Sequence, residues 1–383
     1  MNILFFMRYW PIYGGGETVT ATLANEFVKN NIGVHVAYQY YNTIETKPYS
    51  LDDRIKEVCL HTTENFKKSD VVAVQEYVRN NDIDIIINQW GCLELCHKAV
   101  WGTNCKIIHC CHTSVLMPVT KPSGIKQTLI NKILSQKCYE KFFRWNQIRI
   151  LKKNYKRCDR YIFLAKSFAN EYKALTKIND KQGKIGYISN PLTFDVFYDL
   201  KKYSLKQKEV LFVGRIFEYP KRISYILKIW EKIEKNPSFN EWKLTIVGDG
   251  DDLPHFVEMS KEKKLQRVSF EGFKAPQPYY ERSSVFLMTS SSEGFGMTLV
   301  EAQQYGVVPI AMDSYASLHD IISDHENGVI VKDDDIDGFV SELENLMTNE
   351  IARQKMAENA VHSCKKFSMD DVKNKWFELF GSL

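Results

Sequence analysis

The sequence lacks the long apolar run that a membrane-spanning helix requires. No stretch of its 383 residues approaches the roughly 20 consecutive apolar residues needed to cross a bilayer. The opening stretch, MNILFFMRYWP, is apolar, but it has neither a charged start nor a small-residue cleavage site, so we interpret it as a strand and not as a signal peptide. We therefore expect a cytoplasmic protein, one that at most rests peripherally on the inner face of the membrane.

The sequence also has little net charge and no paired C-x-x-C spacing in its two stretches of metal-ligating side chains. A net charge of +4 gives no argument for nucleic-acid binding. Nine cysteines at irregular spacing fit reduced thiols better than a disulfide framework. Buried thiols explain the two Cys/His stretches better than a zinc site does, so we predict no bound metal. These stretches, GCLELCH and IIHCCHTS, contain Cys92, Cys96, His97, Cys110, Cys111 and His112.

Alternating apolar and helical patterns predict the fold class. The length is too great for one ordinary core. Near-continuous apolar strands separated by amphipathic stretches indicate parallel sheets covered on both faces, and the series occurs twice. We predict an α/β protein with two Rossmann-like, doubly wound domains facing a central cleft. The boundaries are an N-terminal domain over 1–190, a linker over 191–206, a second domain over 207–366 and a C-terminal helix over 367–383.

In each half of the chain, one motif follows the first predicted strand, at the edge where such sheets bind ligands. The YGGGE motif places Gly14, Gly15 and Gly16 before a helix, where an anion could approach the backbone; a plain tight turn explains the glycines equally well. VGRIFEYPKRIS places Arg215 at a strand end and Lys221 six residues later. Two converging cations suit a diphosphate, and a pair of solvated surface cations is the alternative.

The stretch SSSEGFGMTLVEA combines a glycine bend with two acids. Gly294 and Gly296 let the chain leave a strand, and a helix begins at about Met297, whose amide end favours a phosphate. Glu301 could accept hydrogen bonds from paired ribose hydroxyls, and Glu293 from sugar hydroxyls. A glutamate that serves only the helix dipole would account for Glu301, but not for the bend before it.

At these residues the chain resembles the retaining glycosyltransferases of family 4, which have the GT-B fold and hold a nucleotide-sugar donor mainly with the second domain. SSSEGFGMTLVEA is similar to the family's two-glutamate motif, and VGRIFEYPKR to its Arg and Lys pair. GGGETVTATLANEF resembles its first loop and helix, and the end of the chain resembles its helix that crosses back onto the first domain. The resemblance thus extends over nearly the whole chain.

The resemblance implies a role for each residue. Arg215 and Lys221 would bind the donor diphosphate and stabilise the departing nucleotide, with Arg222 adjoining as a competing cation. Glu301 would hold the ribose. His112 would touch the sugar near the reacting carbon, with His109 as its rival. Glu293, together with the backbone of Gly294, Phe295 and Gly296, would face the transferred sugar. Backbone groups of Met297, Thr298 and Leu299 would meet the phosphates, and Gly14, Gly15 and Gly16 would let the diphosphate and acceptor approach.

The resemblance further implies a metal-independent transfer with no cofactor, in which a hexose-type sugar passes to a glycan or lipid-linked acceptor in bacterial surface-polysaccharide synthesis. We expect a UDP-sugar donor, with a GDP-sugar second. The DID stretches at 82–84 and 335–337 are interpreted as solvated turns and not as metal ligands. A sugar-nucleotide epimerase and a non-catalytic nucleotide-sugar-binding subunit remain alternatives. A dehydrogenase is disfavoured because G-x-G-x-x-G is missing.

Residues 121–157 form a basic stretch with interspersed apolar side chains. The stretch has eleven Lys or Arg residues and a single acid, Glu140. Such a segment could rest on an anionic membrane, which suits a lipid-linked acceptor. A core helix with a solvated basic face is the other interpretation. The apolar side chains in it are Phe142, Phe143, Trp145, Ile148 and Ile150.

Overall fold

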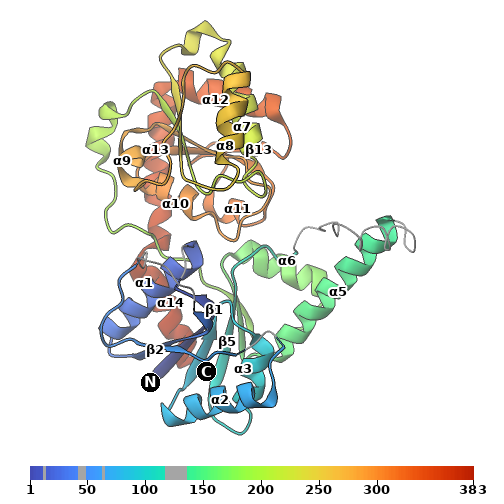
Figure 1. The fold of residues 1–383 in the computed structure, drawn as a ribbon. Coiled ribbons are helices and arrows are strands. Elements are labelled where there is room, and N and C mark those ends of the chain that lie inside the picture. The colour runs from blue at the N-terminus through green and yellow to red at the C-terminus, as the bar shows by residue number, and fades with distance from the viewer. Residues whose placement is uncertain (12–13, 42–48, 63–64, 117–135) are drawn as a thin grey trace. The chain divides into compact units, whose positions relative to one another are not determined.

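The structure, a computed structural model, describes residues 1–11, 14–41, 49–62, 65–116 and 136–383. The chain divides into two compact units, Met1–Ser189 with Lys373–Leu383, and Asn190–Val372. Each unit contains one parallel β-sheet with helices between its strands (Figure 1). Among the described residues, none of the helices is both long and apolar enough to cross a membrane.

The first unit has a seven-stranded sheet in the order β3-β2-β1-β4-β5-β6-β7. Because β1 lies between β2 and β4, the strand order reverses at the β1/β4 pair, which is where doubly wound sheets bind ligands. The strands are β1 (Asn2–Trp10), β2 (Gly33–Tyr41), β3 (Lys56–Cys59), β4 (Ile85–Asn88), β5 (Lys106–Cys111), β6 (Arg160–Phe163) and β7 (Ile185–Tyr187).

Strand β3 is the one strand of this sheet that the apolar pattern does not predict. It has the sequence KEVC, with its first two side chains exposed and the others half-buried. It pairs only with β2 and therefore forms a sheet edge. An edge strand needs little apolar surface, so the signal that identifies the buried strands is missing here.

The helices of the first unit include the C-terminal one. The phenyl ring of Phe27 in α1 lies 6.2, 5.8 and 5.4 Å from the rings of Trp376, Phe377 and Phe380 in α14. An ion pair of 2.9 Å between Lys373 and Glu26 supports this packing. The helices are α1 (Gly15–Lys29), α2 (Lys68–Asn80), α3 (Leu93–Ala99), α5 (Gln136–Lys156), α6 (Lys166–Thr176) and α14 (Met369–Gly381), whose first residues belong to the second unit.

The second unit has a six-stranded sheet in the order β10-β9-β8-β11-β12-β13. Its strand order reverses at the β8/β11 pair. All six strands coincide with predicted apolar runs; five of them are largely buried, and the edge strand β10 is half-buried. The strands are β8 (Glu209–Val213), β9 (Lys243–Val247), β10 (Val268–Phe270), β11 (Val285–Met288), β12 (Val308–Asp313) and β13 (Val329–Lys332).

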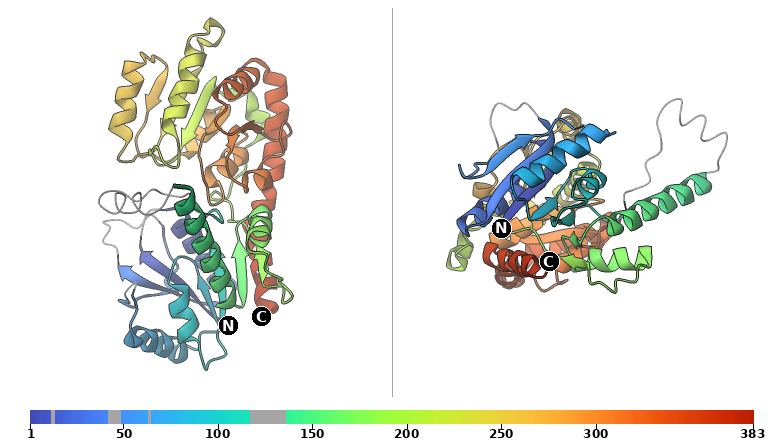
Figure 2. Two further views of the ribbon diagram at one scale, coloured as in Figure 1. Left: turned by 90° about the vertical axis from the view of Figure 1, so that its right-hand side faces the viewer. Right: turned by 90° about the horizontal axis from the view of Figure 1, so that it is seen from below.

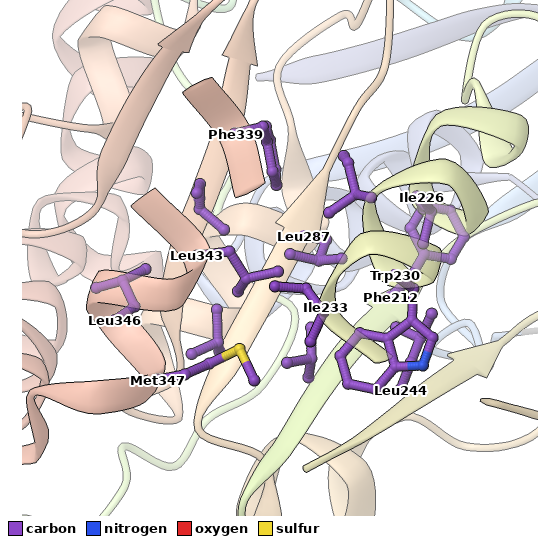
Figure 3. Packing of buried hydrophobic residues seen from close by; sticks show 14 of the residues in the cluster. Phe212, Ile226, Trp230, Ile233, Leu244, Leu287, Phe339, Leu343, Leu346 and Met347 are labelled. Atoms are coloured by element: carbon purple, nitrogen blue, oxygen red, sulfur yellow. The ribbon is translucent and has the colours of Figure 1, made fainter. Parts of the chain in front are cut away.

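Helices pack on this second sheet through one continuous hydrophobic core (Figure 3). Trp230 of α7 is fully buried, and Leu343 of α12 lies in the same cluster. Both helices have apolar residues spaced by three and four, the spacing that buries one helix face. The helices are α7 (Ile223–Glu234), α8 (Leu253–Glu262), α9 (Gln277–Arg282), α10 (Met297–Gln304), α11 (Leu318–Ile321), α12 (Ile336–Thr348) and α13 (Glu350–Ser363), with short 3-10 turns at Leu200–Leu205, Pro237–Phe239 and Cys364–Phe367.

Candidate functional site

Two predicted motifs of the second unit meet where its strand order reverses. One lies in the loop between β8 and α7, the other in the loop between β11 and α10. The Thr289 hydroxyl donates to the Lys221 carbonyl at 2.9 Å, and the Ser291 N–H donates to the Pro220 carbonyl at 2.8 Å. These bonds hold the two loops together, so residues about 70 positions apart in sequence share one site.

Lys221 and Glu293 form an ion pair at this junction. The distance between Nζ and Oε1 is 2.6 Å, and the two side chains are 16% and 15% exposed. Arg215 lies in the same loop as Lys221, just beyond the end of β8, with its side chain exposed. The structure thus places a cation and a carboxylate of the predicted set in contact.

Arg222, the competing cation, is engaged elsewhere. It adopts a left-handed conformation with φ of 52°, and its guanidinium lies 2.6 Å from an Asp333 oxygen and 3.2 Å from an Asp334 oxygen. Two acids of the β13–α12 loop thus hold Arg222, and Lys221 is the cation that contacts Glu293.

The two DID stretches have structural partners. Asp335 precedes α12, and its carboxylate accepts from the Gly338 N–H at 2.8 Å, as a helix N-cap does. Asp337 pairs with Lys232 at 2.7 Å, and Asp84 accepts from the Asn2 N–H at 2.7 Å. Within the part of the chain that the structure describes, no cluster of three or more His, Cys, Asp or Glu side chains could hold a metal ion.

The glycine bend leads directly into α10. Gly296 has φ of 100°, a conformation that strongly favours glycine, and it precedes Met297. The N–H groups of Leu299 and Val300 donate to the Gly296 carbonyl at 3.0 and 3.3 Å. The first N–H groups of a helix have no carbonyl one turn earlier, so Met297 and Thr298 supply the amides best placed for an anion.

Phe295 anchors the bend through its side chain. It is 3% exposed, and its ring meets the ring of Phe367 edge to face at 5.3 Å. The Ser317 hydroxyl donates to the Phe295 carbonyl at 3.2 Å. The side chain therefore packs inward, and of the two adjoining glycines Gly294 is half-buried and Gly296 is buried.

Glu301 is buried and held by two hydroxyl groups that sequence reasoning missed. Its Oε1 accepts from Thr193 at 2.6 Å and its Oε2 accepts from Tyr280 at 2.9 Å. Burial raises the pKa of Glu301, and these two hydrogen bonds oppose that rise. Thr193 lies in the predicted linker and Tyr280 in a helix without a motif, so nothing local indicates their role. Each carboxylate oxygen retains a further lone pair for a ligand hydroxyl.

A further glycine pair shapes this site. A Cβ atom on Gly248 would lie 1.8 Å from the Gly214 carbonyl oxygen, and one on Gly250 would lie 2.4 Å from the Ile216 carbonyl oxygen. The Ile216 N–H donates to the Asp249 carbonyl at 2.8 Å. Only glycine permits this close backbone approach, which fixes the loop that contains Arg215. The sequence VGDGD after a strand was the available signal.

In the first unit, the glycine loop lies against an aromatic side chain. The described part of the loop begins at Gly14, and α1 starts at Gly15, where an added Cβ would meet nothing within 4 Å. A Cβ on Gly16 would lie 2.7 Å from the indole nitrogen of Trp90, just beyond β4. The loop thus combines open backbone at Gly15 with a close contact at Gly16.

His112 lies directly after β5, in contact with the same tryptophan. Its ring stacks on Trp90 at 4.8 Å, and its Nε2 hydrogen-bonds to the Gln89 side-chain oxygen. Its Nδ1 is buried and has no hydrogen-bond partner among the described residues. Burial lowers the pKa of His112 to about 3, so the ring is neutral at pH 7.

The rival histidine, His109, is packed inside the sheet. The Asn88 amide donates to its Nδ1 at 2.9 Å, and its ring stacks on Tyr161 at 4.9 Å. Burial lowers the pKa of His109 to about 4. Its contacts are those of a core histidine.

Replacing His109 with glutamine should reduce the acid sensitivity of folding. The pKa of His109 is lower in the folded chain than the ordinary value of about 6.5, so the unfolded chain takes up a proton first as the pH falls. Stability is therefore fully present above pH ~6.5 and is lost as the pH falls towards the folded pKa. Urea unfolding at pH 7 and pH 5 measures the free energy of unfolding at each pH. The loss of this free energy between pH 7 and pH 5 should be about 2 kcal/mol smaller in His109→Gln than in the wild-type chain. His325→Gln, at an exposed site, is the control, and equal losses in all three proteins would contradict the prediction.

Part of the predicted basic stretch forms α5, while residues 121–135 lie outside the described residues. Figures 1 and 2 show the N-terminal half of α5 standing away from the sheet of its own unit. Phe142 and Trp145 are 59% and 56% exposed, and the Arg149 guanidinium lies 5.5 Å from the Trp145 ring centroid. This half of α5 is therefore not a core helix.

Comparisons with known proteins agree over nearly the whole chain. The family model described as Glycosyltransferase Family 4 matches residues 13–194, and the model described as Glycosyl transferases group 1 matches residues 199–363. An alpha-1,4-N-acetyl-D-galactosaminyltransferase of Campylobacter jejuni is 25% identical over 97% of this chain and 96% of its own length. Its name gives an undecaprenol-linked glycan as its substrate. The amylovoran biosynthesis glycosyltransferase AmsD of Erwinia amylovora is 31% identical over 47% of this chain and half of its own length.

Solved structures share the fold. The lipopolysaccharide outer core galactosyltransferase WaaB has a TM-score of 0.71 at 20% identity, with both chains fully covered. The pneumococcal O-GlcNAc transferase GtfA, in complex with UDP and GlcNAc, has a TM-score of 0.76 at 14% identity and covers 100% of this chain and 99% of its own. At these identities the similarity establishes the two-domain GT-B architecture.

Proposed function

The chain belongs to the family 4 glycosyltransferases of GT-B fold, and on that premise we propose that it moves a hexose-type sugar from a nucleotide-sugar donor to a glycan or lipid-linked acceptor in bacterial surface-polysaccharide synthesis. One observation supports this most: Lys221, Glu293 and the amide end of α10 meet where the strand order reverses. The epimerase and binding-subunit alternatives gain no support from the comparisons.

We propose that the second unit holds the donor through its diphosphate. Arg215 and Lys221 provide positive charge, and the amides of Met297 and Thr298 add the dipole of α10. The difficult step of glycosyl transfer is the separation of a diphosphate from an oxocarbenium-like sugar. These groups neutralise the leaving charge without a metal ion. The transfer then proceeds with retention, and a donor phosphate oxygen takes the acceptor proton.

Glu293 exchanges partners in this mechanism. The diphosphate competes with Glu293 for Lys221, and the released carboxylate then accepts from hydroxyls of the transferred sugar. His112, neutral at pH 7, contacts the same sugar through a ring nitrogen.

Replacing Glu293 with glutamine should therefore strengthen the binding of UDP alone by about threefold to tenfold. The reason is that the negative carboxylate, which competes with the diphosphate for Lys221, is removed. Transfer from the UDP-sugar should fall, because a sugar contact is lost. Isothermal titration with UDP measures the first effect, with Glu241→Gln, at an exposed ion pair with Lys208, as control. Weaker UDP binding by Glu293→Gln would show that the carboxylate does not compete with the diphosphate.

We propose uridine as the donor base. Related structures support this: GtfA was solved with UDP, and Anabaena HepE, with a TM-score of 0.72 at 15% identity, was solved with UDP-glucose. A thermal-shift screen of UDP, GDP and their sugars tests the choice, because a ligand that binds only the folded state raises Tm. The nucleotide sugar that raises Tm is then incubated with the protein. Slow release of free sugar from it identifies a transferase, whereas a product that keeps its nucleotide identifies an epimerase. Loss of activity in EDTA with recovery in Mn²⁺ would refute metal independence.

We also propose that α5 rests on an anionic membrane surface. Its exposed Phe142 and Trp145 lie among basic residues, the composition of an interfacial helix. The double variant Phe142→Ser, Trp145→Ser should lower sedimentation with vesicles of phosphatidylglycerol and phosphatidylcholine by at least fivefold. Phe273→Ser, which removes an exposed phenylalanine of the second unit, should leave sedimentation unchanged. If the wild-type chain stays in the supernatant at low salt, the membrane proposal is wrong.

A further inference from the structure

A cavity of about 300 Å³ lies in the first unit between α5 and the carboxyl ends of β4 and β5. Trp90 and His112 form its wall at the strand ends, and Tyr161 of β6 adds a third ring. The cavity belongs entirely to the first unit. Its volume is that of a pocket for one small ligand.

Helix α5 lines the cavity with one face, on which Ile150 remains 47% exposed, and carries the exposed Phe142 and Trp145 on another face. The residues on the cavity side are spaced by three and four positions, as on one helix face. At about 100° per residue, this face lies roughly opposite the exposed Phe142 and Trp145. The cavity-lining residues of α5 are Gln147, Ile150, Leu151 and Asn154.

The lining combines flat aromatic surface with a few polar groups. Trp90 is 38% exposed, so part of its indole surface is available to a ligand, while its ring also stacks on His112. Val115 and Leu151 provide apolar surface. The side-chain amides of Gln147 and Asn154 can both donate and accept hydrogen bonds. A ligand with an apolar ring face, a methyl group and an amide would match this lining.

The imidazole of His112 forms part of the cavity wall, with its Nδ1 buried. Its Nε2 donates to Gln89, which places the lone pair on Nδ1. That nitrogen is buried without a partner among the described residues, and an unpaired buried acceptor costs free energy. Burial keeps the pKa of His112 at about 3, so the ring is neutral throughout the neutral range.

We propose that this cavity binds the terminal sugar of the acceptor, and that the sugar is an N-acetylhexosamine. The pyranose ring lies on Trp90, the acetamido methyl group contacts the apolar wall from α5, and the acetamido amide bonds to Gln147 or Asn154. This inference rests on the transferase function proposed above, and it adds the acceptor class.

Alkyl glycosides provide the binding test. Octyl β-N-acetylglucosaminide and its N-acetylgalactosamine counterpart should shift the imidazole NMR signals of His112 at millimolar concentration, and octyl β-glucoside should do so at least fivefold more weakly. This readout requires no catalysis, so it tests the cavity even where the transferase assignment fails. The proposal would be overturned if neither N-acetyl glycoside shifted the His112 signals, or if octyl β-glucoside shifted them as much as the N-acetyl glycosides do.

Filling the cavity provides the kinetic test. Ile150→Trp should lower kcat/KM for transfer to an N-acetyl glycoside by more than tenfold, and hydrolysis of the donor in water by much less. Asn154→Leu should raise KM for the N-acetyl glycoside with little change in kcat. Lys152→Trp, on the exposed side of α5, adds the same bulk outside the cavity and should leave both activities unchanged. Parallel losses of transfer and hydrolysis in Ile150→Trp, or no loss of transfer, would refute the acceptor assignment.

Discussion

Replacing Arg215 with alanine is expected to lower kcat for sugar transfer by roughly 10²–10³-fold, the usual effect of removing one group that stabilises developing negative charge. The charge on the nucleotide diphosphate grows as the glycosidic bond breaks. Arg215 extends from the end of β8 in the loop that Gly248 and Gly250 hold in place. Its planar guanidinium can bond to two phosphate oxygens at once in a fixed fork, a geometry that the ammonium of Lys221 lacks.

The size of this effect should depend on geometry as well as on charge. Arg215→Lys keeps the charge but loses the two-oxygen contact, so it should recover only part of the lost rate. Lys208→Ala removes an exposed cation just before the opposite end of β8 and should leave kcat unchanged. Stopped-flow or discontinuous transfer assays at saturating donor separate kcat from donor binding. An Arg215→Ala enzyme with wild-type kcat would exclude any role in leaving-group stabilisation.

The fold was predictable where burial leaves a continuous apolar run. The strands β8, β9, β11, β12 and β13 have such runs, whereas the edge strand β3 has a mostly polar sequence and was missed. The apolar pattern also identifies the repeat of strand and helix that gives two parallel sheets. It contains no information on how a helix such as α5 divides its faces between a cavity and solvent, because that depends on contacts far apart in the sequence.

The site was predictable only where its residues are neighbours in sequence. A glycine bend followed by a helix start is local chemistry, so Gly296 and Met297 could be identified. The choice between Lys221 and Arg222 could not be made, because it depends on Asp333 and Asp334, more than 100 positions away. Thr193, which holds Glu301 from outside every motif, was missed for the same reason.

Replacing Glu301 with alanine is expected to weaken UDP binding by about 10- to 100-fold, the loss of one or two hydrogen bonds to a charged acceptor. The buried carboxylate is fixed by Thr193 and Tyr280, so it needs no reorganisation to accept from the ribose. Isothermal titration with UDP, 2′-deoxy-UDP and 3′-deoxy-UDP tests the contact directly. The wild-type chain should bind at least one deoxy analogue much more weakly than UDP, and Glu301→Ala should bind all three alike.

Tyr280→Phe distinguishes positioning of Glu301 from direct contact with the ribose. Burial raises the pKa of Glu301 and the Tyr280 hydroxyl opposes that rise, so removing the hydroxyl raises the pKa further. Protonated Glu301 has one fewer acceptor site, so UDP binding weakens as the pH falls through this pKa. In Tyr280→Phe the decline should begin at higher pH than in the wild-type chain, with discrimination against the deoxy analogues kept at alkaline pH. The wild-type chain and Glu301→Ala could instead show the same loss of affinity for the deoxy analogues relative to UDP. The ribose would then have to be bound by another group, and Glu301 would be buried for packing alone.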